Sequence, residues 1–292
     1  MTGNTINGNI VASVIKSRVK KEVEKMKSKG QVIPCLATVL VGNDPASAIY
    51  VNNKQKAAAE VGIGTKDHKM SSDISQNELL ASISKLNKDP GVHGILVQLP
   101  LPQGINEADV INRITPSKDV DGLTETNAGM LFNGRATLIP CTPLGIMQLL
   151  DYYKIELESI DAVVLNRSNL VGKPLAILLL QRNASVMVCH SKTKNLIDKI
   201  KSADLIVTAV GNRERFALSS NMIKDGAIIV DVGISRLNGR PVGDVEDFES
   251  MKKKASWITP VPGGVGPMTI AMLLNNTVLA ASRATANTQP EH

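Results

Sequence analysis

Aromatic residues are scarce in this chain of 292 residues, since Phe, Trp and Tyr together make up only 2% of it. Proteins that bind single-stranded nucleic acid usually stack the bases on aromatic side chains, so this scarcity argues against that function. The net charge of +6 is spread along the sequence and forms no long basic arm. A mild positive field favours a small anionic ligand instead, and we expect no nucleic-acid partner.

Cysteine and histidine are also few. The three cysteines form no C-x-x-C pair, and the four histidines lack the spacing of metal ligands, so we expect no metal site. Isolated cysteines in apolar surroundings are typical of reduced thiols in a cytoplasmic protein. The N-terminus lacks the basic and apolar blocks of a signal peptide, and no apolar run approaches the length of a membrane span. We therefore expect a cytoplasmic protein without a membrane partner.

Apolar runs typical of buried strands alternate along the chain with segments of helical period. This order predicts an α/β fold with parallel sheets covered by helices on both faces, and the length allows two domains. The expected strands are 32–41, 66–70, 92–99, 162–165, 185–189, 204–210, 227–232 and 257–259. The expected helices are 9–29, 48–61, 76–87, 106–113, 142–154, 175–180, 195–202 and 268–284.

The segment 161–193 has the order of a βαβ unit of the Rossmann type. A buried strand ends at Leu165, a polar turn follows at 166–169, and a helix then leads to a second strand at 185–189. Such a turn places backbone N–H groups where a phosphate can bind. The G-x-G-x-x-G pattern is absent, however, and only Gly172 remains. Many α/β proteins contain such a unit without a ligand, so the unit alone leaves both possibilities open.

The residues after the second strand favour NADP over NAD. An NAD site would place an acidic residue there for the ribose hydroxyls, whereas this chain has His190, Ser191 and Lys192, with Arg167 in the first turn. Donors without an acid suit a 2′-phosphate. Each cation alone could be an ordinary solvated side chain, but their position at adjacent strand ends predicts an NADP site.

In the first half of the chain, chemically active residues gather at expected strand ends. Tyr50 and Lys54 lie four apart and share one face of a helix, Gln98 ends a strand, and Asp121 lies in a polar turn. A lysine, an amide and a carboxylate at neighbouring strand ends can form a polar pocket in which a proton is mobile. Taken singly, each residue also has an ordinary structural explanation. The sequence contains neither a G-x-S-x-G elbow nor a Walker loop.

Five segments, in this order, resemble the bifunctional methylenetetrahydrofolate dehydrogenase/cyclohydrolase family over nearly the whole chain. They are SAIYVNNKQK (47–56), GILVQLPLP (94–102), PSKDVDG (116–122), RSNLVGKP (167–174) and TPVPGGVGPMT (259–269). The last segment is especially specific to the family. Together they identify the chain as a member where each one alone would not.

The resemblance implies two α/β domains facing each other across a cleft. The folate-binding catalytic domain, with a parallel sheet, is expected at 1–141 plus 270–292, and the C-terminal helix would pack back on it. The Rossmann-like NADP-binding domain is expected at 142–269, and it would also form a homodimer. The implied substrates are tetrahydrofolate derivatives. NADP would oxidise 5,10-methylenetetrahydrofolate to the methenyl cation, and water would then convert the cation to 10-formyltetrahydrofolate.

The resemblance also implies roles for individual residues. Lys54 would move a proton in the hydrolytic step, with a lowered pKa in a dry cleft; Gln98 would position it, Asp121 would bind the pterin, and Tyr50 would stack on the aminobenzoyl ring. The residues expected to bind substrate are Tyr50, Lys54, Gln98, Leu99, Asp121, Pro262, Gly263 and Gly264. Those expected to bind the cofactor are Asn166, Arg167, Ser168, Ser191 and Ile234.

One residue departs from the family pattern, because the family usually has glycine at the position of Asn166. Asparagine tolerates a left-handed backbone, so the turn can survive, but the side chain could crowd the pyrophosphate. One alternative is therefore an enzyme of this fold that has lost one activity: a dehydrogenase with poor cyclohydrolase activity or, if Asn166 blocks NADP, a cyclohydrolase with impaired NADP use. A separate alternative is a non-catalytic nucleotide-binding regulator, which would not need Lys54.

Overall fold

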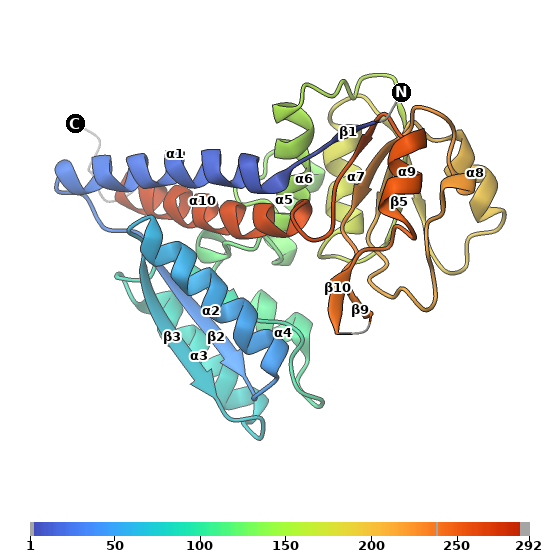
Figure 1. Ribbon diagram of the computed structural model, residues 1–292. Helices are drawn as coiled ribbons and strands as arrows, with labels where there is room; N and C mark the ends of the chain where they lie inside the picture. Colours follow the sequence, from blue (N-terminus) through green and yellow to red (C-terminus); the bar gives the residue numbers. More distant parts are fainter. Residues whose placement is uncertain (1–2, 238, 287–292) are drawn as a thin grey trace. The chain divides into compact units, whose positions relative to one another are not determined.

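The computed structural model describes residues 3–237 and 239–286, which form two compact units (Figure 1). Unit 1 consists of Met1–Ser13 and Thr142–Thr269, and unit 2 of Val14–Cys141 and Ile270–His292. Each unit has its own parallel sheet. The two-domain α/β class expected from the alternating pattern is confirmed.

The sheet of unit 2 has three parallel strands in the order β3-β2-β4. They are β2 (Cys35–Val41), β3 (Gly64–Met70) and β4 (Gly94–Val97). Nearly every residue of β2 and β4 is buried, as expected for strands covered on both faces. β3 is an edge strand and exposes the charged side chains of Lys66, Asp67 and Lys69, which protect the edge from further pairing.

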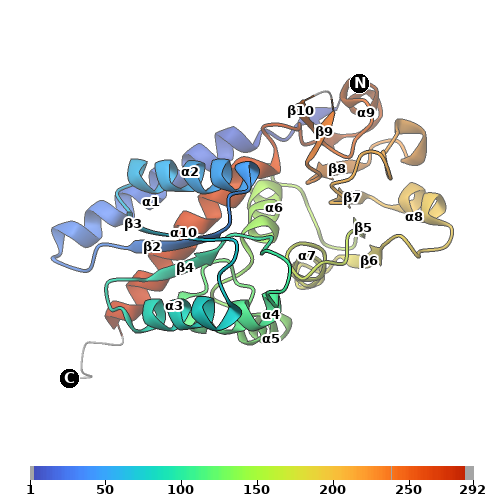
Figure 2. The same ribbon diagram turned by 90° about the horizontal axis from the view of Figure 1, so that it is seen from below.

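Helices cover both faces of this sheet. α2 (Pro45–Glu60) packs on β2 and β3, and its N-terminus is capped by the Asp44 carboxylate, which accepts from the N–H of Ser47 at 2.7 Å. On the opposite face, α3 (Gln76–Lys88) and α4 (Glu107–Asn112) share an apolar core with β2 and β4. Figure 2 shows α2 and α3 on opposite sides of the strands. The short helix α5 (Glu125–Phe132) and a 3-10 turn at Pro116–Lys118 complete the segment after α4.

Two long helices run in parallel beside this sheet, α1 (Gly8–Ser28) and α10 (Val265–Ala286) (Figure 1). Arg18 donates to Asn275 at 3.4 Å and Ser282 contacts the Met26 sulfur at 3.9 Å, which fixes their direction. The expectation that no apolar run reaches the length of a membrane span is wrong for α10. Val265–Thr285 is long and apolar enough by length and composition, but 61% of that window is buried inside the protein, as in a core helix.

The sheet of unit 1 has six parallel strands in the order β1-β11-β8-β7-β5-β6. They are β1 (Asn4–Thr5), β5 (Asp161–Leu165), β6 (Ser185–Cys189), β7 (Leu205–Thr208), β8 (Ile228–Asp231) and β11 (Trp257–Ile258). From β5 the chain moves outward to β6 and then returns to the other side of β5. This reversal makes the carboxyl ends of β5 and β7 the switch point, where ligands bind in doubly wound sheets.

Helices also cover both faces of the unit 1 sheet. α7 (Gly172–Leu180) packs on β5 and β6, whereas α8 (Leu196–Ser202) and α9 (Phe248–Lys254) share a core with residues of the opposite face such as Val163 and Ile206. α6 (Cys141–Tyr152) leads into β5. A small antiparallel hairpin, β9 (Ser235–Leu237) with β10 (Arg240–Val242), projects after β8.

The first residues of the chain cluster with unit 1 by their contacts. Residues up to Ser13 belong to unit 1 and not to the domain that contains residues 14–141. The reason is pairing: β1 lies beside β11, and the N–H of Ile6 donates to the carbonyl of Ile258 at 2.8 Å. The sequence patterns also did not indicate β1, α5, α9 or the β9–β10 hairpin.

Candidate active site

Lys54 and Gln98 meet in unit 2, where the expected pair of a base and an amide is formed. The ammonium group of Lys54, on α2, donates to Oε1 of Gln98 at 3.0 Å. Gln98 follows β4 directly, and its own amide donates to the carbonyl of Leu99 at 2.7 Å. Its backbone N–H donates to Val39 at 2.9 Å, so the residue continues the sheet hydrogen bonding. Both ends of the glutamine side chain are thereby fixed, and its oxygen faces Lys54.

Asp121 lies close enough to Lys54 for the two charges to interact. Burial raises the pKa of the Asp121 carboxyl, and the Lys54 charge together with the Cys141 thiol acts in the opposite direction. The backbone beside Asp121 is anchored, because the carbonyl of Val120 accepts from Asn276 at 2.9 Å and from the Cys141 thiol at 3.3 Å. Burial and the nearby carboxylate raise the pKa of Cys141 well above its ordinary value, so this thiol stays protonated.

The two charged neighbours of Asp121 in the same motif are structural. Lys118 donates to three carbonyls at the end of α3, with distances of 3.4 Å to Leu86, 2.9 Å to Asn87 and 2.8 Å to Asp89. Burial lowers the pKa of this lysine. The buried carboxylate of Asp119 accepts from the N–H of Thr124 and the amide of Asn127, both at 2.8 Å. These contacts occupy Lys118 and Asp119, so Asp121, which is hydrogen-bonded to Cys141, is the acid of the motif that we expect to meet a ligand.

The other expected substrate residues of unit 2 flank this group. Tyr50 lies one turn before Lys54 on α2, and its side chain is 44% exposed, so the ring is accessible for stacking. Leu99 follows Gln98 and is half-buried. Unit 2 therefore gathers Tyr50, Lys54, Gln98, Leu99 and Asp121 at the carboxyl edge of its sheet and the adjoining helix.

Asn166 occupies the turn after β5 in unit 1, and its side chain points into the turn. Its Oδ1 accepts from the backbone N–H groups of Ser168 at 2.7 Å and Gly172 at 3.1 Å. Its Nδ2 donates to the carbonyl of Ala209, beyond β7, at 2.6 Å. The backbone of Asn166 is not left-handed, since its φ is not positive, so the turn does not depend on the tolerance of asparagine for that conformation. The side chain bridges the switch point and is held there by three hydrogen bonds.

The remaining expected cofactor residues present their side chains to solvent at the same edge. Arg167, Ser168, Ser191 and Ile234 are all exposed. Ser168 also caps the turn, since its hydroxyl accepts from the N–H of Val171 at 3.1 Å. An exposed guanidinium and hydroxyl groups at a switch point, with no acid at the end of β6, fit an NADP phosphate.

The segment Pro262–Gly264 also lies in unit 1. Gly263 has a φ of +103°, a conformation that favours glycine, and its carbonyl accepts from the N–H of Gly8 at 2.8 Å. A Cβ on Gly8 would lie 1.7 Å from the carbonyl oxygen of Gly264, so the two backbones are in close contact. The shape of this segment is thus set by packing against the start of α1.

Sequence reasoning missed several polar residues near these sites. Asn276 and Cys141 support the Asp121 loop, and two buried acids, Asp231 and Asp244, lie at the carboxyl edge of the unit 1 sheet. Asn276 and Cys141 reach the Asp121 loop from distant parts of the chain, so local spacing gives no signal for them. A signal for the acids was present, because each Asp stands next to or near a glycine in Asp231-Val232-Gly233 and Gly243-Asp244.

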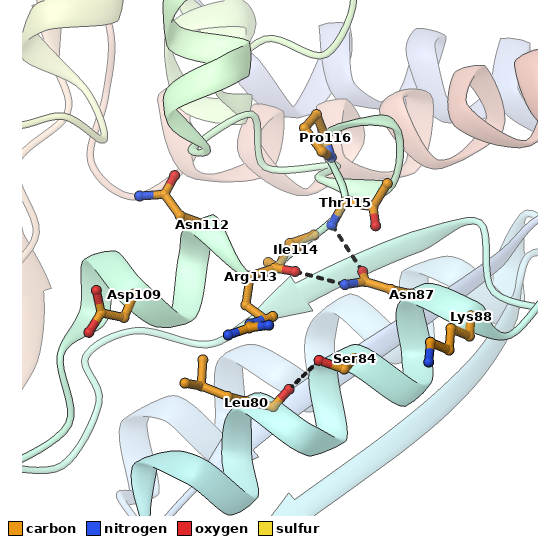
Figure 3. A pocket seen from close by; sticks show the side chains of 10 residues that line it. All are labelled: Leu80, Ser84, Asn87, Lys88, Asp109, Asn112, Arg113, Ile114, Thr115 and Pro116. Carbon is orange, nitrogen blue, oxygen red and sulfur yellow. Dashed lines mark hydrogen bonds between the residues drawn. The ribbon is translucent and has the colours of Figure 1, made fainter.

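A groove on unit 2 lies apart from these residues. It has a volume of about 820 Å³ and runs between the second half of α3 and the segment 109–116 (Figure 3). The amide of Asn87 bridges it, donating to the carbonyl of Arg113 at 2.7 Å and accepting from the N–H of Thr115 at 3.0 Å. None of the expected site residues lines this groove, and its central amide is already paired. Across the described ranges 3–237 and 239–286, no three His, Cys, Asp or Glu side chains gather as metal ligands.

Comparison with known proteins places both units in one family. The sequence model for the tetrahydrofolate dehydrogenase/cyclohydrolase catalytic domain matches residues 6–121, and the one for the NAD(P)-binding domain matches 140–285. The chain is 57% identical to bifunctional protein FolD of Nitrosopumilus maritimus, covering 97% of this chain and 98% of the relative.

Solved structures agree. The bifunctional FolD dehydrogenase/cyclohydrolase of Campylobacter jejuni is 50% identical with a TM-score of 0.92, covering 96% of this chain and 99% of that one. The Trypanosoma brucei enzyme, solved with NADP and an inhibitor, is 35% identical with a TM-score of 0.92, covering 98% and 99%. The chain therefore belongs to the tetrahydrofolate dehydrogenase/cyclohydrolase family.

Proposed function

We propose that this protein carries out both reactions of its family with NADP as the redox cofactor. It oxidises 5,10-methylenetetrahydrofolate to 5,10-methenyltetrahydrofolate and then hydrolyses the methenyl cation to 10-formyltetrahydrofolate. The single observation that supports this most is the Lys54–Gln98 hydrogen bond of 3.0 Å with the Asp121 carboxyl within reach of the Lys54 charge. A regulator that only binds a nucleotide would not need this group of residues.

In the hydrolytic step, Lys54 moves protons and Gln98 is its positioning residue. Water forms a bond to the methenyl carbon and loses a proton. The bond from that carbon to N5 then breaks as N5 gains a proton, and the new hydroxyl group releases its remaining proton to become the formyl carbonyl. A side chain that accepts the first proton and returns it serves both stages. The bond from Lys54 to Gln98 fixes the ammonium group where a bound folate would need it.

The pterin and the aminobenzoyl ring of the substrate are assigned to the neighbours of Lys54. Asp121 would bind the pterin, and its raised pKa extends the range in which the carboxyl can also donate a proton. Tyr50 offers an exposed ring one turn away, and Leu99 an apolar contact. We assign Pro262, Gly263 and Gly264 to the wall that faces the folate. The catalytic domain is proposed to comprise residues 1–141 and 270–292, which the match of the catalytic-domain sequence model from residue 6 onward supports.

The cofactor site is assigned to the carboxyl edge of the unit 1 sheet. When bound, NADP supplies the acceptor for the hydride that leaves the methylene carbon with its bonding electrons. Arg167 and Ser168 would hold phosphate, Ser191 the 2′-phosphate, and the backbone at Ile234 the other end of the cofactor. Asn166 does not argue for impaired NADP use, because its side chain is taken up by three hydrogen bonds inside the turn.

The assembly is proposed to be a homodimer formed through unit 1. β6 is an edge strand, and it exposes Met187 and Val188, while Leu180 at the end of α7 is 59% exposed. An apolar edge strand that is left unpaired favours association, and two copies of one edge can pair with each other around a two-fold axis.

We also propose that the enzyme works in the cytoplasm with no nucleic-acid or membrane partner. The three cysteines are free thiols, two of them buried, which suits a reducing compartment. Fractionation of cells that express the tagged protein, followed by immunodetection, tests this location. Recovery in the membrane or nucleoid fraction would contradict it.

The substitution Lys54→Met tests the hydrolytic role, with Lys56→Met as the matched control because Lys56 is an exposed lysine of the same helix. We expect Lys54→Met to lower the rate of methenyltetrahydrofolate hydrolysis by about 10²- to 10⁴-fold, the usual contribution of a positioned acid–base group, with the fold intact by circular dichroism. The Lys56→Met rate should stay near that of the wild type. Equal rates in both variants would exclude Lys54 from catalysis.

A further inference from the structure

Two buried acids at the carboxyl edge of the unit 1 sheet have no part in the chemistry assigned above. Asp231 ends β8 and is 2% exposed, and Asp244 follows β10 and is 0% exposed. A buried carboxylate is costly unless hydrogen bonds stabilise it. The partners of these two acids are mostly backbone N–H groups of the loops at the ligand-binding edge.

Asp244 holds the loop that follows β7. One carboxylate oxygen accepts from the hydroxyl of Thr208 at 2.8 Å and the N–H of Val210 at 2.7 Å, and the other accepts from the N–H of Gly211 at 3.0 Å. The same loop is held from the opposite side, because Asn166 donates to the carbonyl of Ala209. The loop beside the switch point is therefore fixed by side chains from two directions.

Asp231 holds the segments on either side of the β9–β10 hairpin. Its oxygens accept from the N–H groups of Gly233 at 3.0 Å, Asp244 at 3.0 Å and Val245 at 2.8 Å. Glycine is required at two of the neighbouring positions. A Cβ at Gly243 would lie 2.1 Å from an Asp231 oxygen, and one at Gly233 would lie 2.3 Å from an Asp244 oxygen. The carboxylates of Asp231 and Asp244 therefore pack directly against the backbone of Gly243 and Gly233.

Arg213 closes the network from the loop after β7. Its guanidinium donates to the carbonyl of Gly243 at 2.8 Å and also to those of Val245 and Glu246. Its backbone N–H donates to the hydroxyl of Ser235, after β8, at 3.0 Å. Asp231 and Arg213 together satisfy N–H and carbonyl groups of the segment 243–246. The loops after β7, β8 and β10 are thereby joined in one hydrogen-bond network.

We propose that Asp244 and Asp231 are positioning residues for NADP, which set the loops at 209–212 and 232–234 before the cofactor binds. This inference rests on the cofactor site proposed above. The two loops lie close together, since a Cβ placed on Gly211 would be 3.8 Å from the carbonyl oxygen of Ile234. Val210 and Ile234 are 39% and 50% exposed at that edge. Loops that are ordered in advance lower the entropy cost of binding.

The substitution Asp244→Asn in the full-length protein tests the proposal. The substitution replaces one of the two acceptor oxygens with an amide group, which can only donate. Depending on which oxygen is replaced, residue 244 loses the hydrogen bond from Gly211 or the two hydrogen bonds from Thr208 and Val210. We expect the dissociation constant of NADP, measured by calorimetric titration, to rise about tenfold, the effect of one lost hydrogen bond to a charged group. Amide hydrogen exchange at Val210 and Gly211 should be faster in the protein without cofactor. Thr208→Val removes a single bond, and is the variant to use if Asp244→Asn does not fold; it should weaken NADP binding in the same direction.

The control is Asp204→Asn, at the opposite edge of the same sheet. Asp204 accepts from the N–H of Asp161 at 2.9 Å and pairs with Lys224 at 2.6 Å, so its loss also costs stability. Its NADP dissociation constant should stay within twofold of the wild type. Unchanged affinity in Asp244→Asn, or equal weakening in Asp204→Asn, would overturn the inference.

The variant Arg167→Ala shows whether a negative result contradicts only the positioning role of Asp244 and Asp231 or also the assignment of the cofactor site. If Arg167→Ala weakens NADP binding while Asp244→Asn and Thr208→Val do not, the site stands and the positioning role is wrong. If none of the three variants changes NADP binding, the site assigned to this edge is wrong, and the positioning role falls with it.

Discussion

Arg167 is the residue that we expect to determine the preference for NADP over NAD. Its guanidinium is exposed beside the switch point, and no acid at the end of β6 would compete for it. We expect Arg167→Ala to weaken NADP about tenfold or more, since a charge-assisted bond to phosphate is lost, and to change NAD affinity much less. Titration of both cofactors measures this. If binding of NADP and of NAD weakens equally, Arg167 does not bind the 2′-phosphate, and the assignment of the 2′-phosphate site is contradicted.

Lys118 lies in the same sequence motif as Asp121, but its role is structural. Its ammonium group satisfies carbonyls at the end of α3. We expect Lys118→Met to lower the free energy of unfolding by about 2 kcal/mol, because these carbonyls lose a charged hydrogen-bond donor. Lys85 is an exposed lysine of α3, and Lys85→Met should change the free energy of unfolding by no more than about 0.5 kcal/mol. Urea denaturation of both variants decides, and a Lys118→Met protein as stable as the control would contradict the assignment.

The residues that could be predicted from the sequence are those with local spacing. Tyr50 and Lys54 lie on one helix turn, and the Lys54–Gln98 contact followed from two neighbouring strand ends. The inward orientation of Asn166 was not predictable, because its partner Ala209 lies 43 residues further on. The same holds for Asn276, whose bond to Val120 joins residues 156 apart. Side-chain partners that depend on tertiary contacts leave no periodic signal.

At the scale of elements, the loop network of unit 1 gives the stability a pH dependence. Burial raises the pKa of Asp231 from 3.8 to about 6, and the charged side chains nearest to it in the network are Asp244 and Arg213. The folded state then binds a proton more tightly than the unfolded state. The stabilisation from this proton is complete below pH 3.8 and is lost as the pH rises through 6.

Comparison of the wild type with Asp231→Asn at two pH values measures this contribution. Between about pH 5 and pH 7, the wild type should lose about 1 kcal/mol of unfolding free energy more than Asp231→Asn, which has no carboxyl to titrate at this position. Urea denaturation in matched buffers gives both values. A wild type whose stability relative to the variant stays constant over this range would mean that Asp231 is ionised throughout, and would contradict the raised pKa.

Long elements with strong periods were predicted, whereas short ones were not. α1, α3, α10 and the buried strands follow apolar patterns over many residues. β1 has only two residues, and its pairing with β11 joins the two ends of the chain. α9 is seven residues long and ends in three lysines, so little apolar pattern marks it. Tertiary pairing and caps, such as the bond from Asp247 to the N–H of Ser250, define these elements instead.

At the scale of the whole molecule, the exposed edge of β6 predicts the oligomeric state. We expect a dimer by size-exclusion chromatography with light scattering, and a monomer after Met187→Glu with Val188→Glu, because two buried charges would oppose the apolar contact. Phe132→Glu is the control, since Phe132 is 71% exposed on unit 2. A wild-type monomer, or a double variant that stays dimeric, would contradict an interface at β6.

We propose above all a dual activity, in which one chain reduces NADP with 5,10-methylenetetrahydrofolate and hydrolyses 5,10-methenyltetrahydrofolate. Its most direct test is a spectrophotometric assay of the purified protein with 5,10-methylenetetrahydrofolate, run in parallel with NADP and NAD, with hydrolysis of methenyltetrahydrofolate followed separately. We expect reduction of NADP, much weaker reduction of NAD, and active hydrolysis. Hydrolysis without reduction of either cofactor would leave a cyclohydrolase alone, and the absence of both reactions from folded protein would contradict the account.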